Sequence, residues 1–207
     1  MKKLASLAAV AAFSLATSGH VLADRAAGGP PDSFQVRYVS NLDIGDSVIN
    51  ITNAGTLSGT DPAGNICVNA YVFDPSEELQ ECCSCLVTPN ALKSWSVESD
   101  LTDNPLTPGM LNSVVIKLVA TSANGANTCS ASSTLPTTKN LVPGMRAWGT
   151  TLHSLPTTPV TYGVTETQFS PAVLSVSELS HLTSTCADIV KNGSGAGICR
   201  SCNLGGR

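Results

Sequence analysis

The stretch Cys82-Cys83-Ser84-Cys85 decides how this chain is held together, because it places three thiols within four residues. Side chains alternate in direction along an extended segment, so Cys82 and Cys83 are expected to bond to separate partners. A second pair of thiols, in Cys199-Arg200-Ser201-Cys202, lies far along the chain. The full set is Cys67, Cys82, Cys83, Cys85, Cys129, Cys186, Cys199 and Cys202. An even number of cysteines predicts four disulfides, whose pairing the sequence leaves open.

Two other uses of these thiols remain open at this point. The two clusters, brought together, could hold a tetrahedral zinc ion or an iron–sulfur cluster. The Cys-x-x-Cys spacing of Cys199 and Cys202 also occurs in redox proteins, although there it usually begins a helix, and here it follows a predicted one. A c-type haem is excluded because Asn203 stands where that motif needs histidine. Disulfides are the favoured interpretation, and no cofactor is expected.

Residues 1–23 have the three parts of a secretory signal. Lys2 and Lys3 form a basic start, an apolar run covers residues 4–16, and Val21-Leu22-Ala23 suits a signal peptidase that cuts before Asp24. The apolar run is shorter than the roughly 20 residues of a membrane-spanning helix. We therefore expect a secreted protein, extracellular or periplasmic, with no membrane span, in an oxidising compartment.

The remaining chain is predicted to form one domain. Residues 24–33 contain Gly28-Gly29-Pro30-Pro31 and are expected to be a flexible leader, and residues 34–207 a single disulfide-bonded domain. The formal net charge of the full chain is −4, and removing the two signal lysines makes it more negative. No stretch concentrates basic residues, which argues against nucleic acid or anionic lipid as partner.

Seven short segments have the composition of β-strands. They are rich in β-branched and aromatic residues and are separated by Gly, Pro, Asn and Asp. These segments are residues 34–38, 46–52, 66–73, 94–98, 113–121, 145–152 and 160–164. Their number and spacing predict a mainly β fold, an antiparallel β-sandwich.

One helix is predicted near the C-terminus. Ser175-Val176-Ser177-Glu178 fits a capping box, with Ser175 as the N-cap. Apolar residues then recur at helical spacing: Leu179, Leu182, Cys186, Ile189 and Val190. Asn192-Gly193 provides the stop. We expect this helix to lie on the sandwich, with Cys186 fastening it to a neighbouring element.

Recognisable catalytic motifs are missing from the sequence, so an enzyme is not expected. His153 and His181 belong to no His-Glu-x-x-His motif, and no Gly-x-Ser-x-Gly elbow occurs. The glycine-rich residues 193–197 follow a helix instead of opening one, so they are interpreted as a helix stop rather than a phosphate loop.

Two weaker binding hypotheses come from scattered residues. Asp100, Asp103 and Asn104, or Asp61 and Asn65, could hold calcium, although neither set matches an EF-hand loop, and no metal site is predicted. Four aromatic residues could line a sugar-binding face, although the core is favoured for them. They are Tyr71, Trp95, Trp148 and Tyr162.

Several motifs together resemble a family of exported bacterial proteins of uncharacterised function. They are Asn65-Ile66-Cys67-Val68-Asn69, Phe73-Asp74-Pro75, Cys82-Cys83-Ser84-Cys85-Leu86-Val87-Thr88-Pro89, Trp148-Gly149-Thr150-Thr151-Leu152-His153, Asn192-Gly193-Ser194-Gly195 and Gly197-Ile198-Cys199-Arg200-Ser201-Cys202. The resemblance extends over nearly all of the chain after the signal. It implies export and carries no activity, ligand or catalytic residue.

Export, a low-charge β-rich body and many cross-links favour a structural or adhesive extracellular module. Such a module could be a subunit of a surface filament or matrix that associates with itself or with a cell-surface partner. The segment through Tyr38 could then act as a strand donated to a neighbouring subunit. The alternative is a soluble secreted module that binds a glycan or a partner protein, and a metal–redox protein or an enzyme is less favoured.

Overall fold

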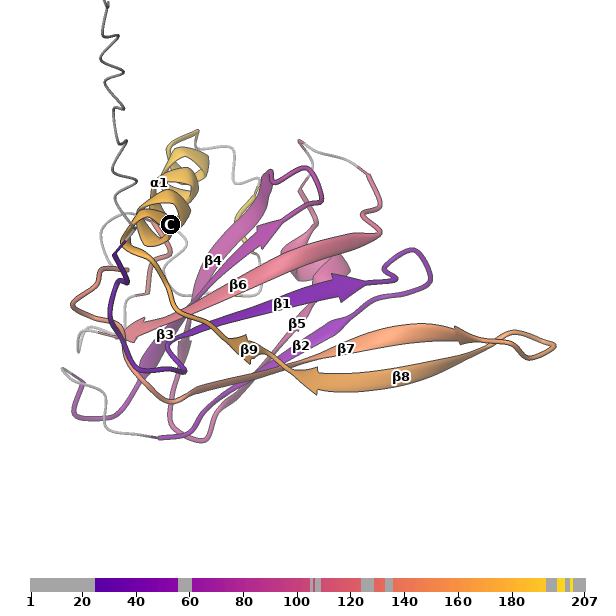
Figure 1. The fold of residues 1–207 in the computed structure, drawn as a ribbon, viewed down its shortest axis with the longest axis horizontal. Helices are drawn as coiled ribbons and strands as arrows, with labels where there is room; N and C mark the ends of the chain where they lie inside the picture. Colours follow the sequence, from indigo (N-terminus) through magenta and orange to yellow (C-terminus); the bar gives the residue numbers. More distant parts are fainter. Residues whose placement is uncertain are drawn as a thin grey trace, which may run out of the picture.

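The computed structural model describes residues 25–55, 61–104, 106, 109–123, 129–132, 136–192, 197–199 and 202 (Figure 1). The predicted signal segment 1–23 and residues 193–196 of the glycine-rich loop lie outside these ranges. The strands are β1 (Phe34–Ser40), β2 (Val48–Asn53), β3 (Ile66–Phe73), β4 (Leu79–Val87), β5 (Leu92–Ser96), β6 (Ser113–Ser122), β7 (Met145–Leu155), β8 (Thr161–Gln168) and β9 (Ser170–Pro171). A short π-helix, η1 (Val97–Leu101), follows β5, and the α-helix α1 (Val176–Asn192) comes after β9.

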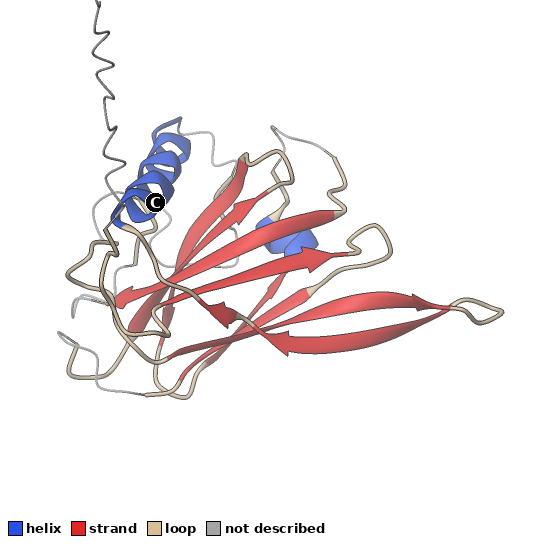
Figure 2. Cartoon of the chain, in the orientation of Figure 1, coloured by secondary structure: helices blue, strands red, loops and turns tan. Residues whose placement is uncertain are grey.

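The strands form two antiparallel sheets. One has the order β4-β3-β6-β1-β9, and the other has the order β5-β2-β7-β8. Figure 2 shows the strands in two layers, with α1 against one of them. The predicted class, a mainly β, disulfide-bonded sandwich with one C-terminal helix, is confirmed. Within the described part of the chain, no helix has the length and apolar character that a membrane crossing requires.

The core lies between the two sheets. The inward residues Ile49 and Ile51 of β2 and Trp95 of β5 are fully buried. They belong to one apolar cluster with Val68 of β3 and Ile116 of β6, which come from the opposite sheet. Along β2 the burial alternates, so every second side chain enters this space.

The helix α1 covers the outer face of the five-stranded sheet. Ser175 accepts a hydrogen bond from the Glu178 backbone N–H at 3.1 Å, so the predicted N-cap is confirmed. The Glu178 carboxylate does not accept the Ser175 backbone N–H, as a full capping box would require, because it pairs with Lys117 of β6 at 2.5 Å. Leu182 is fully buried, whereas Val190, expected on the same face, is 37% exposed.

Three of the four disulfides fasten the C-terminal part of the chain to the edge strand β4. Cys82 bonds to Cys186 of α1, Cys83 bonds to Cys199, and Cys85 bonds to Cys202, while Cys67 of β3 bonds to Cys129. The backbone also pairs there, because Cys82 and Ile198 form a parallel bridge and the Cys82 N–H donates to the Gly197 carbonyl at 2.8 Å. The two thiol clusters therefore do meet, as disulfides and not as a metal centre.

Three elements differ from the sequence-based expectation. The strand β4 was not predicted, because its cysteines and buried polar residues give no alternating pattern. The two-residue β9 is too short to be recognised in a sequence. The predicted strand 94–98 ends at Ser96, because Asp46 accepts the Glu98 N–H at 2.9 Å and Ser96 caps η1 by accepting from the Ser99 N–H.

The segment before β1 is packed against the fold, so the expectation of a flexible leader over residues 24–33 is wrong for its described part. Ala26 bridges to Ser175, and the Ala27 N–H donates to the Leu174 carbonyl at 2.7 Å. Ala27 and Ser33 are buried. The following strand β1 pairs with β6 along its length and with β9 at Gln35 and Val36, so the segment through Tyr38 is not free to be donated to a neighbouring subunit.

Candidate functional site

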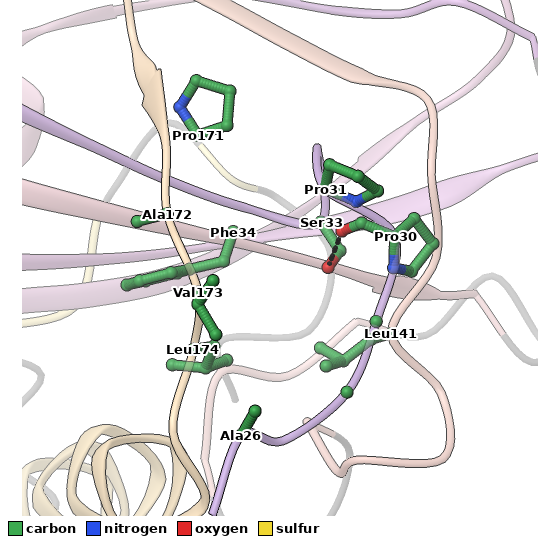
Figure 3. A pocket seen from close by; sticks show the side chains of 12 residues that line it. Ala26, Pro30, Pro31, Ser33, Phe34, Leu141, Pro171, Ala172, Val173 and Leu174 are labelled. Carbon is green, nitrogen blue, oxygen red and sulfur yellow. Dashed lines mark hydrogen bonds between the residues drawn. The ribbon is translucent and has the colours of Figure 1, made fainter.

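Two adjoining hollows lie beside the segment that precedes β1, and Pro31 and Pro171 border both of them. The first hollow has a volume of about 390 Å³ and an apolar lining. Figure 3 shows it between two stretches of backbone, with Pro30 and Pro31 on one side and Val173 and Leu174 on the other. Its complete lining is Ala26, Gly28, Gly29, Pro30, Pro31, Ser33, Phe34, Leu141, Pro171, Ala172, Val173 and Leu174.

This apolar hollow exists because residues 26–33 bend around Leu141 before entering β1. A turn holds the bend, in which Ser33 donates its N–H to the Pro30 carbonyl at 2.9 Å and its hydroxyl to the same oxygen at 2.7 Å. The lining contains no ionisable side chain, so the hollow can take an apolar group and has no acid or base of its own.

The second hollow, of about 430 Å³, has more polar side chains in its lining than the first, and it is called the polar hollow. It is lined by Pro31, Asp32, Gln35, Arg146, Gln168 and Pro171. Asp32 and Arg146 form an ion pair at 2.5 Å, and the same Asp32 oxygen accepts the Gly144 N–H at 3.1 Å. Both hollows fall within the range of about 300–1,000 Å³ that is usual for small-molecule sites.

Gln35 forms the buried side of the polar hollow. Its side chain lies on β1, opposite Pro171 of β9, and the residue is 1% exposed. The amide nitrogen donates to the Met145 carbonyl at 2.9 Å and to the Asp32 carbonyl at 3.2 Å. The amide oxygen accepts no hydrogen bond from the described residues. Because buried polar groups are nearly always paired, this oxygen marks the hollow as a place for a hydrogen-bond donor.

The chain matches no known family model. It is also similar to no curated protein and to no solved structure at a significant level.

Arg37 fixes the hairpin of β7 and β8 to the opposite sheet, next to the polar hollow. It donates to the Thr151 hydroxyl at 3.0 Å and to the Thr167 carbonyl at 3.0 Å, and it also bonds to the Thr167 hydroxyl. Its guanidinium lies 6.0 Å from the centre of the Phe169 ring. Desolvation lowers the pKa of Arg37, an effect that the nearby Glu166 carboxylate opposes. The group remains a cation, so its role here is to position the hairpin.

The histidines that the sequence offered are separate from both hollows. His153 is exposed on β7, where its Nε2 lies 2.9 Å from the Thr165 hydroxyl. His181 lies on α1 and stacks on Phe73 of β3, with ring centres 6.3 Å apart. Neither residue lines a hollow described above.

The calcium hypothesis gains no support from the described residues. They contain no group of three or more His, Cys, Asp or Glu side chains that could hold a metal ion. The Asp100 carboxylate accepts the Ser96 N–H, the Asn104 amide donates to the Gln80 carbonyl, and the Asp61 carboxylate accepts the Ala63 N–H. These hydrogen bonds stabilise turns and attach loops to the fold.

The four aromatic candidates divide between the core and the surface. Tyr71 and Trp95 are fully buried, as favoured from the sequence. Trp148 is half-buried, and Tyr162 is 54% exposed, so the expectation that Tyr162 lies in the core is wrong. The reason is that Tyr162 lies on β8, where every residue but one is exposed.

The residues of the polar hollow were not found from the sequence. Asp32, Gln35, Arg146 and Gln168 belong to no motif, and Asp32 and Arg146 are far apart along the chain. In the sequence, Gln35 occupies a polar position of the alternating run 34–38, which indicates the solvent side, so no local pattern reveals that the residue is buried in the structure.

Proposed function

We propose that this chain is an exported structural or adhesive extracellular module that acts by binding and not by catalysis. It associates with further copies of itself, or with surface or matrix material, through the hairpin of β7 and β8. The predicted secretory signal and the four disulfides support export, because disulfides persist in oxidising compartments.

The observation that carries this proposal is the exposure of the hairpin on both faces. Figure 1 shows β7 and β8 extending well beyond the rest of the sandwich. Four large apolar residues near its end are exposed: Leu155 by 42%, Val160 by 58%, Tyr162 by 54% and Val164 by 63%. By the register of β7 and β8, Tyr162 and Val164 share one face, opposite to the face that carries Leu155. Exposed apolar residues gathered on one face are typical of an interaction site.

The strand β8 also ends its sheet. The sheet order β5-β2-β7-β8 gives β8 one paired side, against β7. An edge strand presents backbone N–H and C=O groups that can pair with another chain. In β8 the residues from 161 to 165 carry no charge that would oppose such pairing. Apolar side chains and an open edge therefore coincide on the same strand.

The test measures the mass of the natively purified protein by analytical ultracentrifugation over a range of concentrations. We expect a mass that rises above that of the monomer, and a Tyr162→Ser, Val164→Thr double variant that stays monomeric. Met110→Thr is the matched control, since Met110 is 79% exposed on a loop outside the hairpin and should change nothing.

Electron microscopy of cell-surface material completes the test. The hairpin variant should be depleted from filaments or matrix in which the wild type and the Met110→Thr control are found. A wild-type protein that stays monomeric at every concentration and never occurs in surface material would refute the proposed function.

A further inference from the structure

The polar hollow has the chemistry of a ligand site at its buried side. Both hydrogens of the Gln35 amide nitrogen are used, by the carbonyls of Met145 and Asp32, so the orientation of the amide is fixed. The Gln35 Oε1 atom is left without a donor among the described residues. A group that enters the hollow and carries an O–H or N–H would provide that hydrogen bond.

At the mouth of the hollow lie groups that both donate and accept. Arg146 and Asp32 form an ion pair whose side chains are 40% and 17% exposed, respectively. The pair is electrically neutral as a whole, so it attracts neither anions nor cations strongly. The guanidinium still has N–H donors to offer, and Gln168, exposed on β8, adds an amide with both functions.

Apolar surfaces complete the hollow. The rings of Pro31 and Pro171 form two of its walls. Trp148 does not line the hollow, but it lies directly opposite Gln168 in the register of β7 and β8, so it is a neighbour of that lining amide on the same face of the sheet.

We propose that this hollow binds a neutral carbohydrate unit. A sugar hydroxyl donates to the Gln35 oxygen, further hydroxyls exchange hydrogen bonds with Arg146, Asp32 and Gln168, and the C–H faces of the ring pack on the prolines. The Gln35 oxygen is buried, so this binding requires the exposed side chains of Arg146 and Gln168 to move apart.

Two other ligand classes fit the hollow less well. An acidic ligand would meet the Asp32 carboxylate, which already neutralises Arg146. A peptide backbone is usually recognised along a free strand edge, whereas Gln35 lies on β1, which pairs with both β6 and β9 at that residue. A ligand rich in hydroxyls and without net charge matches the available groups best.

The test is binding of named probes to the full protein by saturation-transfer NMR and calorimetry. The probes are the neutral trisaccharides maltotriose, cellotriose and chitotriose, the acidic sugar glucuronate, and the peptide acetyl-alanyl-alanine amide. We expect at least one neutral trisaccharide to bind at millimolar concentration or below, and the other two classes to bind more weakly.

Three variants assign the binding to this hollow. Gln35→Met, which nearly keeps the shape but removes the acceptor together with the amide donors to Met145 and Asp32, should weaken binding about tenfold or more. Gln168→Ala should weaken the binding several-fold. Because Gln168 is exposed, this variant should fold and serves as the test if Gln35→Met does not fold. Glu166→Gln is the control, because Glu166 lies on the same strand outside the hollow and should leave binding unchanged.

Absence of binding by all three neutral trisaccharides would overturn the inference. So would binding that is unchanged in both Gln35→Met and Gln168→Ala, or a preference for glucuronate or the peptide. These outcomes are separate from the proposed function, because the hairpin variant Tyr162→Ser, Val164→Thr should lose self-association and keep the carbohydrate.

Discussion

Cys82 and Cys83 are neighbours on β4, yet their disulfide partners lie on opposite faces of the same sheet. Cys82 reaches Cys186 on the outer face, where α1 lies, and Cys83 reaches Cys199 within the cluster between the sheets. Between these two disulfides, Ile198 forms a parallel bridge with Cys82, so residues 197–199 lie along the free side of β4. The edge strand is thus bonded covalently on both faces and paired along part of its free side.

The first prediction concerns the two inner disulfides, Cys83–Cys199 and Cys85–Cys202. Each holds nearly the same point of the tail, so removing one pair by double alanine substitution should cost little stability. Removing both pairs opens the covalent loop of roughly 15 residues that runs from Cys186 to these cross-links. This should lower the free energy of unfolding by about 3 kcal/mol. Urea denaturation of the three variants measures this, and equal costs for one pair and for both would contradict it.

The second prediction concerns the close contact at Gly149 of β7. A Cβ atom there would lie 2.5 Å from Arg37 Nε and 3.0 Å from Ile49 Cδ1. Gly149→Ala should therefore push Arg37 away from Thr151 and Thr167 and destabilise the protein by about 1–3 kcal/mol. Gly109→Ala is the matched control, because no atom lies within 4 Å of its added Cβ. A thermal unfolding midpoint that is equal in the two variants would show that the hairpin does not depend on Arg37.

The third prediction concerns the start of α1. Ser175→Ala removes the acceptor of the Glu178 N–H and should cost about 1 kcal/mol of stability, as is usual for an N-cap. Ser180→Ala, at an exposed position inside the same helix, should have no such cost. Chemical denaturation compares the two variants. Should Ser180→Ala be the more harmful, the capping argument fails.

The fourth prediction is a loss of stability in alkali that depends on Tyr71. The Tyr71 hydroxyl donates to the Ala131 carbonyl at 2.7 Å, and burial raises its pKa well above the ordinary value of 10.0. Above about pH 10 the unfolded state loses this proton and the folded state keeps it, so stability should fall by up to about 1.4 kcal/mol per pH unit.

The variant Tyr71→Phe separates this effect from general alkaline damage. It should lower stability near neutral pH, because the Ala131 carbonyl loses its donor, and it should flatten the decline above pH 10. Tyr38→Phe is the control, since Tyr38 is 63% exposed and should leave the pH profile as it is. Unfolding by urea at several pH values measures all three proteins, and an unchanged slope in Tyr71→Phe would refute the prediction.

The elements that could be predicted are those with a local signal. The alternating or continuous apolar residues of β3 and β6 identified both strands, and Ser175 with Glu178 located the start of α1 to the residue. By contrast, the residues that distinguish β4 are its three cysteines, and their disulfide partners all lie more than 100 residues away along the chain. Pairing of that kind depends on the finished fold and has no local pattern.

The candidate site could not be predicted for the same reason. Gln35 bonds to Met145 across 110 residues, and Arg146 pairs with Asp32 across 114. Each of these residues is ordinary in its own neighbourhood. The chain switches sheets between β8 and β9, across the buried Phe169, and this places Gln168 and Pro171 close to β1. The leader was misjudged because Gly28-Gly29-Pro30-Pro31 indicates a turn equally well in a mobile segment and in a docked one.

The late position of Cys199 and Cys202 also bears on the order of folding. Both residues follow every described strand in the sequence, so their disulfides to β4 can form only after all the strands have been synthesised. Until these disulfides form, the free side of β4 is open to pairing with other unfolded chains. Conditions that slow disulfide formation should therefore favour aggregation over the folded monomer.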